Sequence, residues 1–155
     1  MFIVELVMQG VRGIRELARL RFKSGFNFVA AGNESGKTSS VDTVLRLLFP
    51  RNEPQVIESL VSNLTPDASR AALVAYSDDG AYYRVIEDFS KRAVNLSKYN
   101  ASTKDFILMH KDWDDTARFM AELTGGISEG EYNKLYVFRW EQYAVRSSHT
   151  SSLVA

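Results

Sequence analysis

The hydrophobic pattern at the start of the chain predicts three strands. Residues 2–8 are mostly β-branched and apolar, and residues 17–22 alternate between two sets of side chains, as half-buried strands do. Residues 26–30, Phe-Asn-Phe-Val-Ala, predict a third strand that leads directly into a loop containing glycines. The N-terminal part of the chain is therefore expected to form a sheet.

The apolar positions after this loop change to a helical period. They are Val41, Val44, Leu45, Leu48 and Phe49. Because proline cannot continue the hydrogen-bond ladder, Pro50 ends this predicted helix. A second helix is predicted to begin at Pro54, and apolar residues at helical spacing extend it to Leu64.

The middle of the chain has the pattern of an antiparallel β meander. Residues 71–76 and 82–89 flank Asp79-Gly80, and Asp-Gly between two apolar runs is a strong hairpin signal. Two further strands are predicted at residues 94–97 and 106–109.

Helices are predicted again after the meander. Asp112 or Asp114 can cap the first of them, and Gly125-Gly126 can close it. Ser128 and Glu131 have the spacing of a capping box, which predicts a short helix running into residues 137–138. Residues 147–155 are rich in serine and threonine, so we expect one domain over residues 1–146 and a disordered polar tail over residues 147–155.

Composition narrows the class of protein. A chain of 155 residues is about one domain, and its 19 basic and 19 acidic residues cancel, so no bulk charge indicates nucleic acid or membrane. Cysteine is absent, which excludes disulfides and thiolate metal sites. The sequence has neither a signal-peptide pattern nor an apolar run long enough to span a bilayer, so a cytoplasmic protein without membrane contact is expected.

The candidate chemistry lies in the loop between the third strand and the first helix. Its residues are Ala31, Gly32, Asn33, Glu34, Ser35, Gly36, Lys37 and Thr38. Glycines let successive backbone N–H groups turn toward an anion, and the start of the helix adds further free N–H groups and partial positive charge. Lys37 would then reach the β- and γ-phosphates, Thr38 would ligate Mg²⁺, and Ser39 could contact an α-phosphate oxygen. Although Ala31 replaces the first glycine of the motif, this context favours a phosphate-binding loop over a chance turn.

Two segments partly resemble the acidic strand that a complete ATPase needs to hold the Mg²⁺ shell and polarise water. Residues 85–88, Val-Ile-Glu-Asp, belong to the predicted hairpin, so their carboxylates are expected on the solvent face. Residues 137–141 place Arg139 where an acid is required. Neither fits, and residues 123–126, Leu-Thr-Gly-Gly, are better interpreted as a helix end than as an ABC signature.

The two histidines give no evidence of a metal site. His110 and His149 are far apart in the sequence and have no acidic or histidine partner at a ligand spacing. Both are expected at the surface.

Several segments together resemble the N-terminal half of the ATPase heads of the SMC/RecF-like ABC family. They are residues 11–14, 26–30 and 32–38, with weaker matches at 83–89 and 136–143. The resemblance is closest to the YhaN-like and SbcC-like branch of AAA domains. It implies an α/β fold with α+β character: a P-loop NTPase lobe with an N-terminal mixed sheet, a P-loop helix, an antiparallel meander and C-terminal helices.

The same resemblance implies a function. It predicts an ATP- and Mg²⁺-binding lobe of an ATPase in DNA repair or chromosome maintenance, with Arg12 near the nucleotide and Gln142 sensing Mg²⁺. Because Walker B and signature motifs are missing, this lobe would hydrolyse ATP only with a C-terminal lobe or a second head, and DNA is a further candidate partner. Two alternatives remain open: a self-contained small P-loop kinase, and a non-enzymatic interaction domain whose P-loop is degenerate.

Overall fold

A computed structural model of the chain describes residues 1–32 and 35–139. The expectations for Asn33, Glu34, Gln142 and the tail at 147–155 lie outside the described residues, and the domain end at residue 146 stays a prediction. The elements, in chain order, are β1 (Phe2–Gln9), β2 (Ala18–Arg21), α1 (Lys37–Leu48), α2 (Pro54–Glu58), a 3₁₀ turn (Pro66–Ala68), β3 (Arg70–Tyr76), β4 (Tyr82–Asp88), β5 (Ala93–Asn100), β6 (Asp105–His110), α3 (Trp113–Leu123) and α4 (Glu129–Tyr136).

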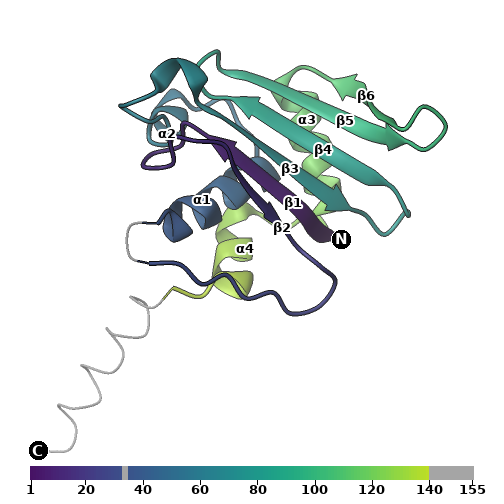
Figure 1. The fold of residues 1–155 in the computed structure, drawn as a ribbon. Coiled ribbons are helices and arrows are strands. Elements are labelled where there is room, and N and C mark those ends of the chain that lie inside the picture. Colours follow the sequence, from purple (N-terminus) through teal and green to yellow (C-terminus); the bar gives the residue numbers. More distant parts are fainter. Residues whose placement is uncertain (33–34, 140–155) are drawn as a thin grey trace, which may run out of the picture.

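The strands form one sheet of six, in the order β2-β1-β3-β4-β5-β6 (Figure 1). All five neighbouring pairs are antiparallel. The predicted hairpin is confirmed: Tyr76 pairs with Tyr82, and Gly80 adopts a φ of +80° in the connecting turn. The predicted meander and the α/β character of the fold are confirmed as well.

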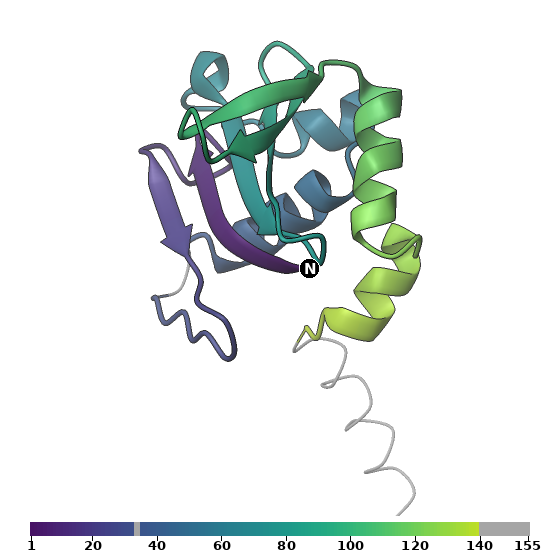
Figure 2. The same ribbon diagram turned by 90° about the vertical axis from the view of Figure 1, so that its right-hand side faces the viewer.

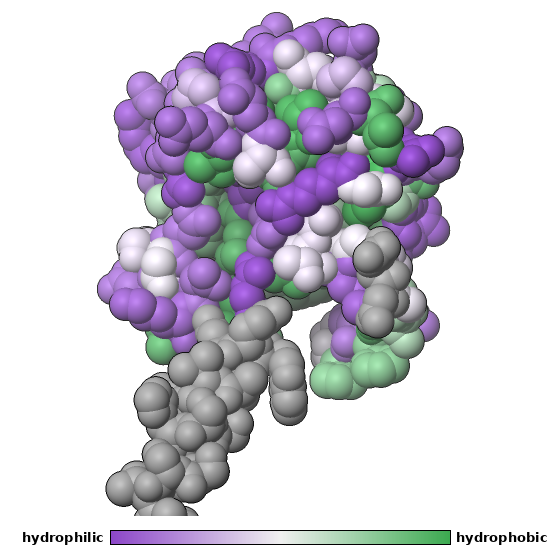
Figure 3. Space-filling view, turned by 90° about the vertical axis from the view of Figure 1, so that its left-hand side faces the viewer, coloured by the Kyte–Doolittle hydropathy of each residue, from purple (hydrophilic) through white to green (hydrophobic). Residues whose placement is uncertain are grey.

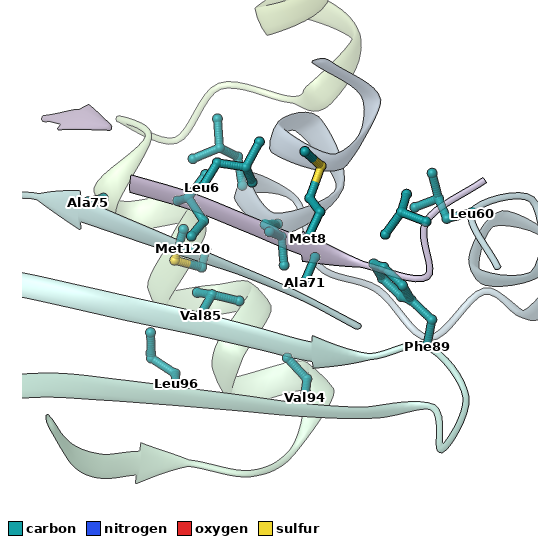
Figure 4. Close-up of a cluster of buried hydrophobic side chains, with 14 of the residues drawn as sticks. Leu6, Met8, Leu60, Ala71, Ala75, Val85, Phe89, Val94, Leu96 and Met120 are labelled. Atoms are coloured by element: carbon teal, nitrogen blue, oxygen red, sulfur yellow. The ribbon is translucent and has the colours of Figure 1, made fainter. Parts of the chain in front are cut away.

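One face of the sheet is covered by α1, α3 and α4 (Figures 1 and 2). The strand residues that point toward these helices are buried, as alternation requires. Among them Leu73, Val85 and Leu96 pack with Leu48 of α1 and Met120 of α3 in the hydrophobic core (Figure 4). The helix that follows the glycine loop is therefore fixed to the middle of the sheet by apolar contacts.

The third predicted strand, residues 26–30, is not formed. This segment has no strand assignment, and the side chains of Phe26 and Phe28 are 92% and 82% exposed. A strand needs a neighbour for its N–H and C=O groups, and this segment pairs with none of the described strands. The sheet is consequently antiparallel throughout instead of mixed.

The second helix is shorter than predicted. It ends at Glu58, and Val61 instead forms an isolated bridge with Val11. Two backbone hydrogen bonds flank this bridge, from Arg12 N to Leu60 O and from Ser62 N to Gly10 O. Pairing with the β1–β2 connection thus replaces the last predicted helical turn.

The helix α3 begins and ends where the sequence predicts, and α4 begins where predicted but ends at Tyr136, before residues 137–138. Asp112 accepts a hydrogen bond from the backbone of Asp115 at the start of α3, and Ser128 and Glu131 form the capping box of α4. Gly126 N donates to Ala121 O with a positive φ, so the paired glycines close α3. None of the helices in the described part of the chain is long and apolar enough to cross a bilayer.

Candidate functional site

The start of α1 differs from the starts of the other two long helices. Gly36 is its N-cap, with no side-chain hydrogen bond to the first turn and no acidic residue within that turn. In contrast, Asp112 and Ser128 cap α3 and α4, and both helices carry acidic side chains in their first turns. The first N–H groups of α1, and the partial positive charge there, are thus left for an anion.

Glycine is required at position 36 for two reasons. Its φ of +89° lies in the left-handed region, which side chains with a Cβ rarely adopt. In addition, a Cβ at this position would lie 2.7 Å from Cδ1 of Ile14. The loop therefore turns into α1 directly against the β1–β2 connection.

Lys37 and the two residues after it, Thr38 and Ser39, differ in their contacts and exposure. Lys37 Nζ donates to the carbonyl oxygens of Ala31 and Gly32, at 2.6 Å each. Thr38 is exposed, so its hydroxyl is accessible, whereas Ser39 is 9% exposed. These residues fit a phosphate- and magnesium-binding loop, because an ammonium, a free hydroxyl and uncapped amides converge at one helix start. The roles predicted for Lys37, Thr38 and Ser39 stay predictions.

Arg12 contacts the side of α1 and not its start. Its Nη1 donates to Asp42 Oδ2 at 2.6 Å, and its Nε donates to the carbonyl of Ser59. Asp42 Oδ1 accepts a second bond from Arg139 Nη2, also at 2.6 Å. Burial raises the pKa of Asp42, but the hydrogen bonds and charges of Arg139 and Arg12 outweigh it and lower the pKa below its usual value. Asp42 therefore joins α1 to the two segments that resemblance places near a nucleotide.

The position of the Glu87 side chain, at the end of β4, differs from the sequence prediction. Glu87 was predicted on the solvent face, yet its side chain is fully buried and pairs with Arg46 of α1, with 2.8 Å between Oε2 and Nε. Burial raises the pKa of Glu87 to about 7, although the charge of Arg46 opposes this shift. Because Arg46 packs over the ring of Trp113, the pair ties the end of α1 to both β4 and α3. Glu87 consequently holds the fold and does not face a nucleotide.

An apolar groove of about 380 Å³ lies beside the start of α1. Its lining includes Leu20 of β2, Val29 of the loop segment, Val41 and Val44 of α1, and Tyr136 of α4. Val41 was expected in the buried stripe of α1 but is 40% exposed. Figure 3 views the molecule from the side where the chain enters α1, and apolar side chains reach the surface there among hydrophilic ones.

The segments that supply Val29 and Tyr136 to the groove expose further apolar side chains. They are Phe26 and Phe28 before Val29, and Leu135 and Phe138 on either side of Tyr136 in the sequence. An apolar surface of this kind is typical of an interaction site.

His110 has acidic neighbours that its sequence spacing did not indicate. Ligand atoms of His110, Asp112 and Asp115 lie within 4.8 Å of one another. Both carboxylates already have partners, since Asp112 caps α3 and Asp115 bonds to Arg118. The cluster is therefore explained by the start of α3.

Sequence reasoning missed the two ion-pair systems of α1. Asp42 and Arg46 are four residues apart on the helix, a spacing that favours a pair between the two, yet each pairs with residues of other segments. Their partners Arg139 and Glu87 are distant in sequence, so only the packing of α1 between the sheet and the segment after α4 brings them together.

Among the comparisons with known proteins, only the one with solved structures gives a match. No protein-family model and no curated protein matches this chain. Among 31 solved chains that match in fold, one comes from a study of the ATP-driven dimerisation and DNA-stimulated activation of SMC ATPases. It is 12% identical, has a TM-score of 0.53, and the match covers 94% of this chain and 96% of that chain. At this identity the similarity concerns the fold alone.

Proposed function

We propose that this chain is the ATP- and Mg²⁺-binding N-terminal lobe of an SMC/RecF-like ATPase acting in DNA repair or chromosome maintenance. The observation that carries the proposal is the start of α1, where an uncapped helix, Lys37 and the exposed Thr38 meet behind Gly36. The lobe's similarity in fold to a protein from work on SMC ATPases supports it.

When ATP and Mg²⁺ bind, the metal would neutralise phosphate charge and orient the terminal phosphate. The first amides of α1 would bind phosphate oxygens, because they have no capping side chain. Lys37 would exchange the carbonyls of Ala31 and Gly32 for phosphate oxygens, and Thr38 would hold the metal.

The lobe would be incomplete as an ATPase. Glu87 is buried in an ion pair with Arg46, so the candidate acidic strand at residues 85–88 does not turn this carboxylate toward the loop, and within the described residues the candidate at 137–141 offers only Arg139, which pairs with Asp42. The exposed apolar side chains around the groove, and the unpaired segment 26–30, support docking of a second lobe or head on this side. The β meander after the P-loop helix, instead of alternating strands and helices, disfavours a self-contained kinase.

Calorimetry with Mg·ATP tests the proposal. We expect the wild-type chain to bind and Lys37→Ala to lose binding, while Lys23→Ala, which removes an exposed lysine outside the loop, binds like the wild type. Equal affinity in Lys37→Ala would contradict the site, and no binding by the wild type would reject nucleotide binding by this lobe alone. If the purified chain hydrolyses ATP, and Lys37→Ala abolishes this turnover, the proposal that the lobe is incomplete as an ATPase would be wrong.

A further inference from the structure

The strand β6 exposes an apolar edge of the sheet. It is the last strand in the sheet order, and Ile107, Leu108 and Met109 are 49%, 44% and 38% exposed. The register with β5 slips at Met109, which leaves this residue without a partner on β5. Three consecutive exposed apolar side chains on an unpaired strand edge favour the addition of another strand.

The opposite edge of the sheet, β2, is protected against strand pairing by its short length and its arginines. β2 has only four residues, and two of them, Arg19 and Arg21, are arginines that bind Glu5. Short length and charge discourage edge pairing. β6 has six residues, and neither lysine, arginine nor proline occurs between Asp105 and His110. Lysine, arginine and proline, which discourage pairing at a sheet edge, are thus absent from β6, and its one irregularity is the register slip at Met109.

We propose that β6 pairs antiparallel with β6 of a second copy of this chain, across a two-fold axis at Leu108. In this register Leu108 faces its own copy, Ile107 faces Met109, and Phe106 faces His110. The two sheets would then continue into each other, and the same patch would serve both protomers, as a two-fold interface requires.

The charges that flank β6 select this register. Antiparallel pairing about Leu108 sets Asp105, the first residue of β6, against Lys111, the residue that follows its last. Opposite charges directly across two strands are favourable, and like charges are not. Within the described part of the chain, Asp105 and Lys111 form no ion pair that would compete.

This interface would be independent of the proposed function. In Figure 1, β6 lies on the other side of the molecule from the start of α1. Pairing through β6 therefore needs no nucleotide, whereas the engagement of ATPase heads is driven by ATP. A dimer that forms without nucleotide would therefore distinguish pairing through β6 from ATP-driven engagement of heads.

Sedimentation equilibrium of the nucleotide-free protein over a dilution series tests the proposal. We expect a dimer of the 17.5 kDa chain. Leu108→Lys should give a monomer, because it sets two like charges against each other at the axis. Because Leu108 is 44% exposed, this variant should fold, and circular dichroism with a thermal melt checks that it does.

Exchanging the charges at positions 105 and 111 distinguishes loss of strand pairing from damage to the fold. Lys111→Asp alone should weaken the dimer about tenfold, because each of the two symmetric contacts then joins two carboxylates. Adding Asp105→Lys to the same chain restores opposite charges and should restore the dimer. Lys91→Asp, which makes the same charge change at an 80% exposed side chain in the β4–β5 turn, should leave it unchanged.

Three results would overturn the proposal. A wild-type protein that stays monomeric throughout the series would do so, and so would a dimer that Leu108→Lys leaves intact. A protein that dimerises only with Mg·ATP would also overturn it, while supporting the nucleotide site.

Discussion

Arg46 and Glu87 form a buried ion pair between the last turn of α1 and the end of β4, with 2.8 Å between Nε and Oε2. Their side chains are 3% and 0% exposed, and Arg46 Nη1 and Glu87 Oε1 have no hydrogen-bond partner among the described residues. The pair anchors α1, although one polar atom of each side chain has no hydrogen-bond partner among the described residues.

Removing one partner of this pair should be far more costly than removing both. Arg46→Met removes the cation that opposes the effect of burial on the pKa of Glu87, so above neutral pH the carboxylate is left unpaired, and there we expect a loss of about 3–5 kcal/mol in the free energy of unfolding. Arg46→Met with Glu87→Leu replaces the pair by apolar groups of similar size and should recover most of that loss. Urea denaturation of the three proteins measures both values. A double variant as unstable as the single one would show that the charges themselves are required.

The raised pKa of Glu87 should make stability depend on pH. This pKa is about 7 in the folded chain and 4.5 for the ordinary group, so the folded state binds the proton more tightly between these values. Its contribution is therefore complete at low pH and is lost as pH rises toward 7 and above. We expect a decrease of about 2–3 kcal/mol in wild-type unfolding free energy between roughly pH 4.5 and 7.5, compared with Glu87→Gln. Parallel pH profiles for the two proteins would contradict this titration.

Gly36→Ala should disturb the loop through both its backbone and its contact with Ile14. A Cβ is strained at a φ of +89° and would lie 2.7 Å from Ile14 Cδ1, so we expect a destabilisation of about 1–3 kcal/mol and loss of Mg·ATP binding. Gly32→Ala is the matched control for stability, since nothing lies within 4 Å of the Cβ it would add. Thermal melts and calorimetry measure the two effects. Equal melting temperatures for both variants would show that Gly36 tolerates a side chain.

Asp42 should contribute stability that disappears in acid. Its lowered pKa means that the folded state favours the carboxylate, so the contribution is present above the ordinary pKa of 3.8 and is lost as pH falls through the folded value. We expect Asp42→Asn to cost about 1 kcal/mol near neutral pH, because the ion pairs with Arg12 and Arg139 are partly exposed. The difference from wild type should shrink below about pH 4. A constant difference across pH would assign the cost to the lost hydrogen-bond geometry instead of the charge.

Local signals in the sequence determined the elements whose chemistry is local. Asp79-Gly80 specified the hairpin, Ser128 and Glu131 specified the start of α4, and Gly125-Gly126 specified the end of α3. Each of these signals works within a few residues, through backbone angles or capping hydrogen bonds, so no distant partner is needed. The glycine loop and the helix after it were predictable for the same reason.

Tertiary structure decided what depends on a distant partner. Residues 26–30 have the composition of a strand, but a strand forms only beside another strand, and the described part of the chain offers none there. Glu87 alternates onto the inner face of β4, yet only the position of α1 brings Arg46 close enough to bury its charge. The sequence by itself therefore determined where the glycine loop and the helix after it lie, while packing across the sheet decided which charges hold that helix and which apolar surface remains uncovered.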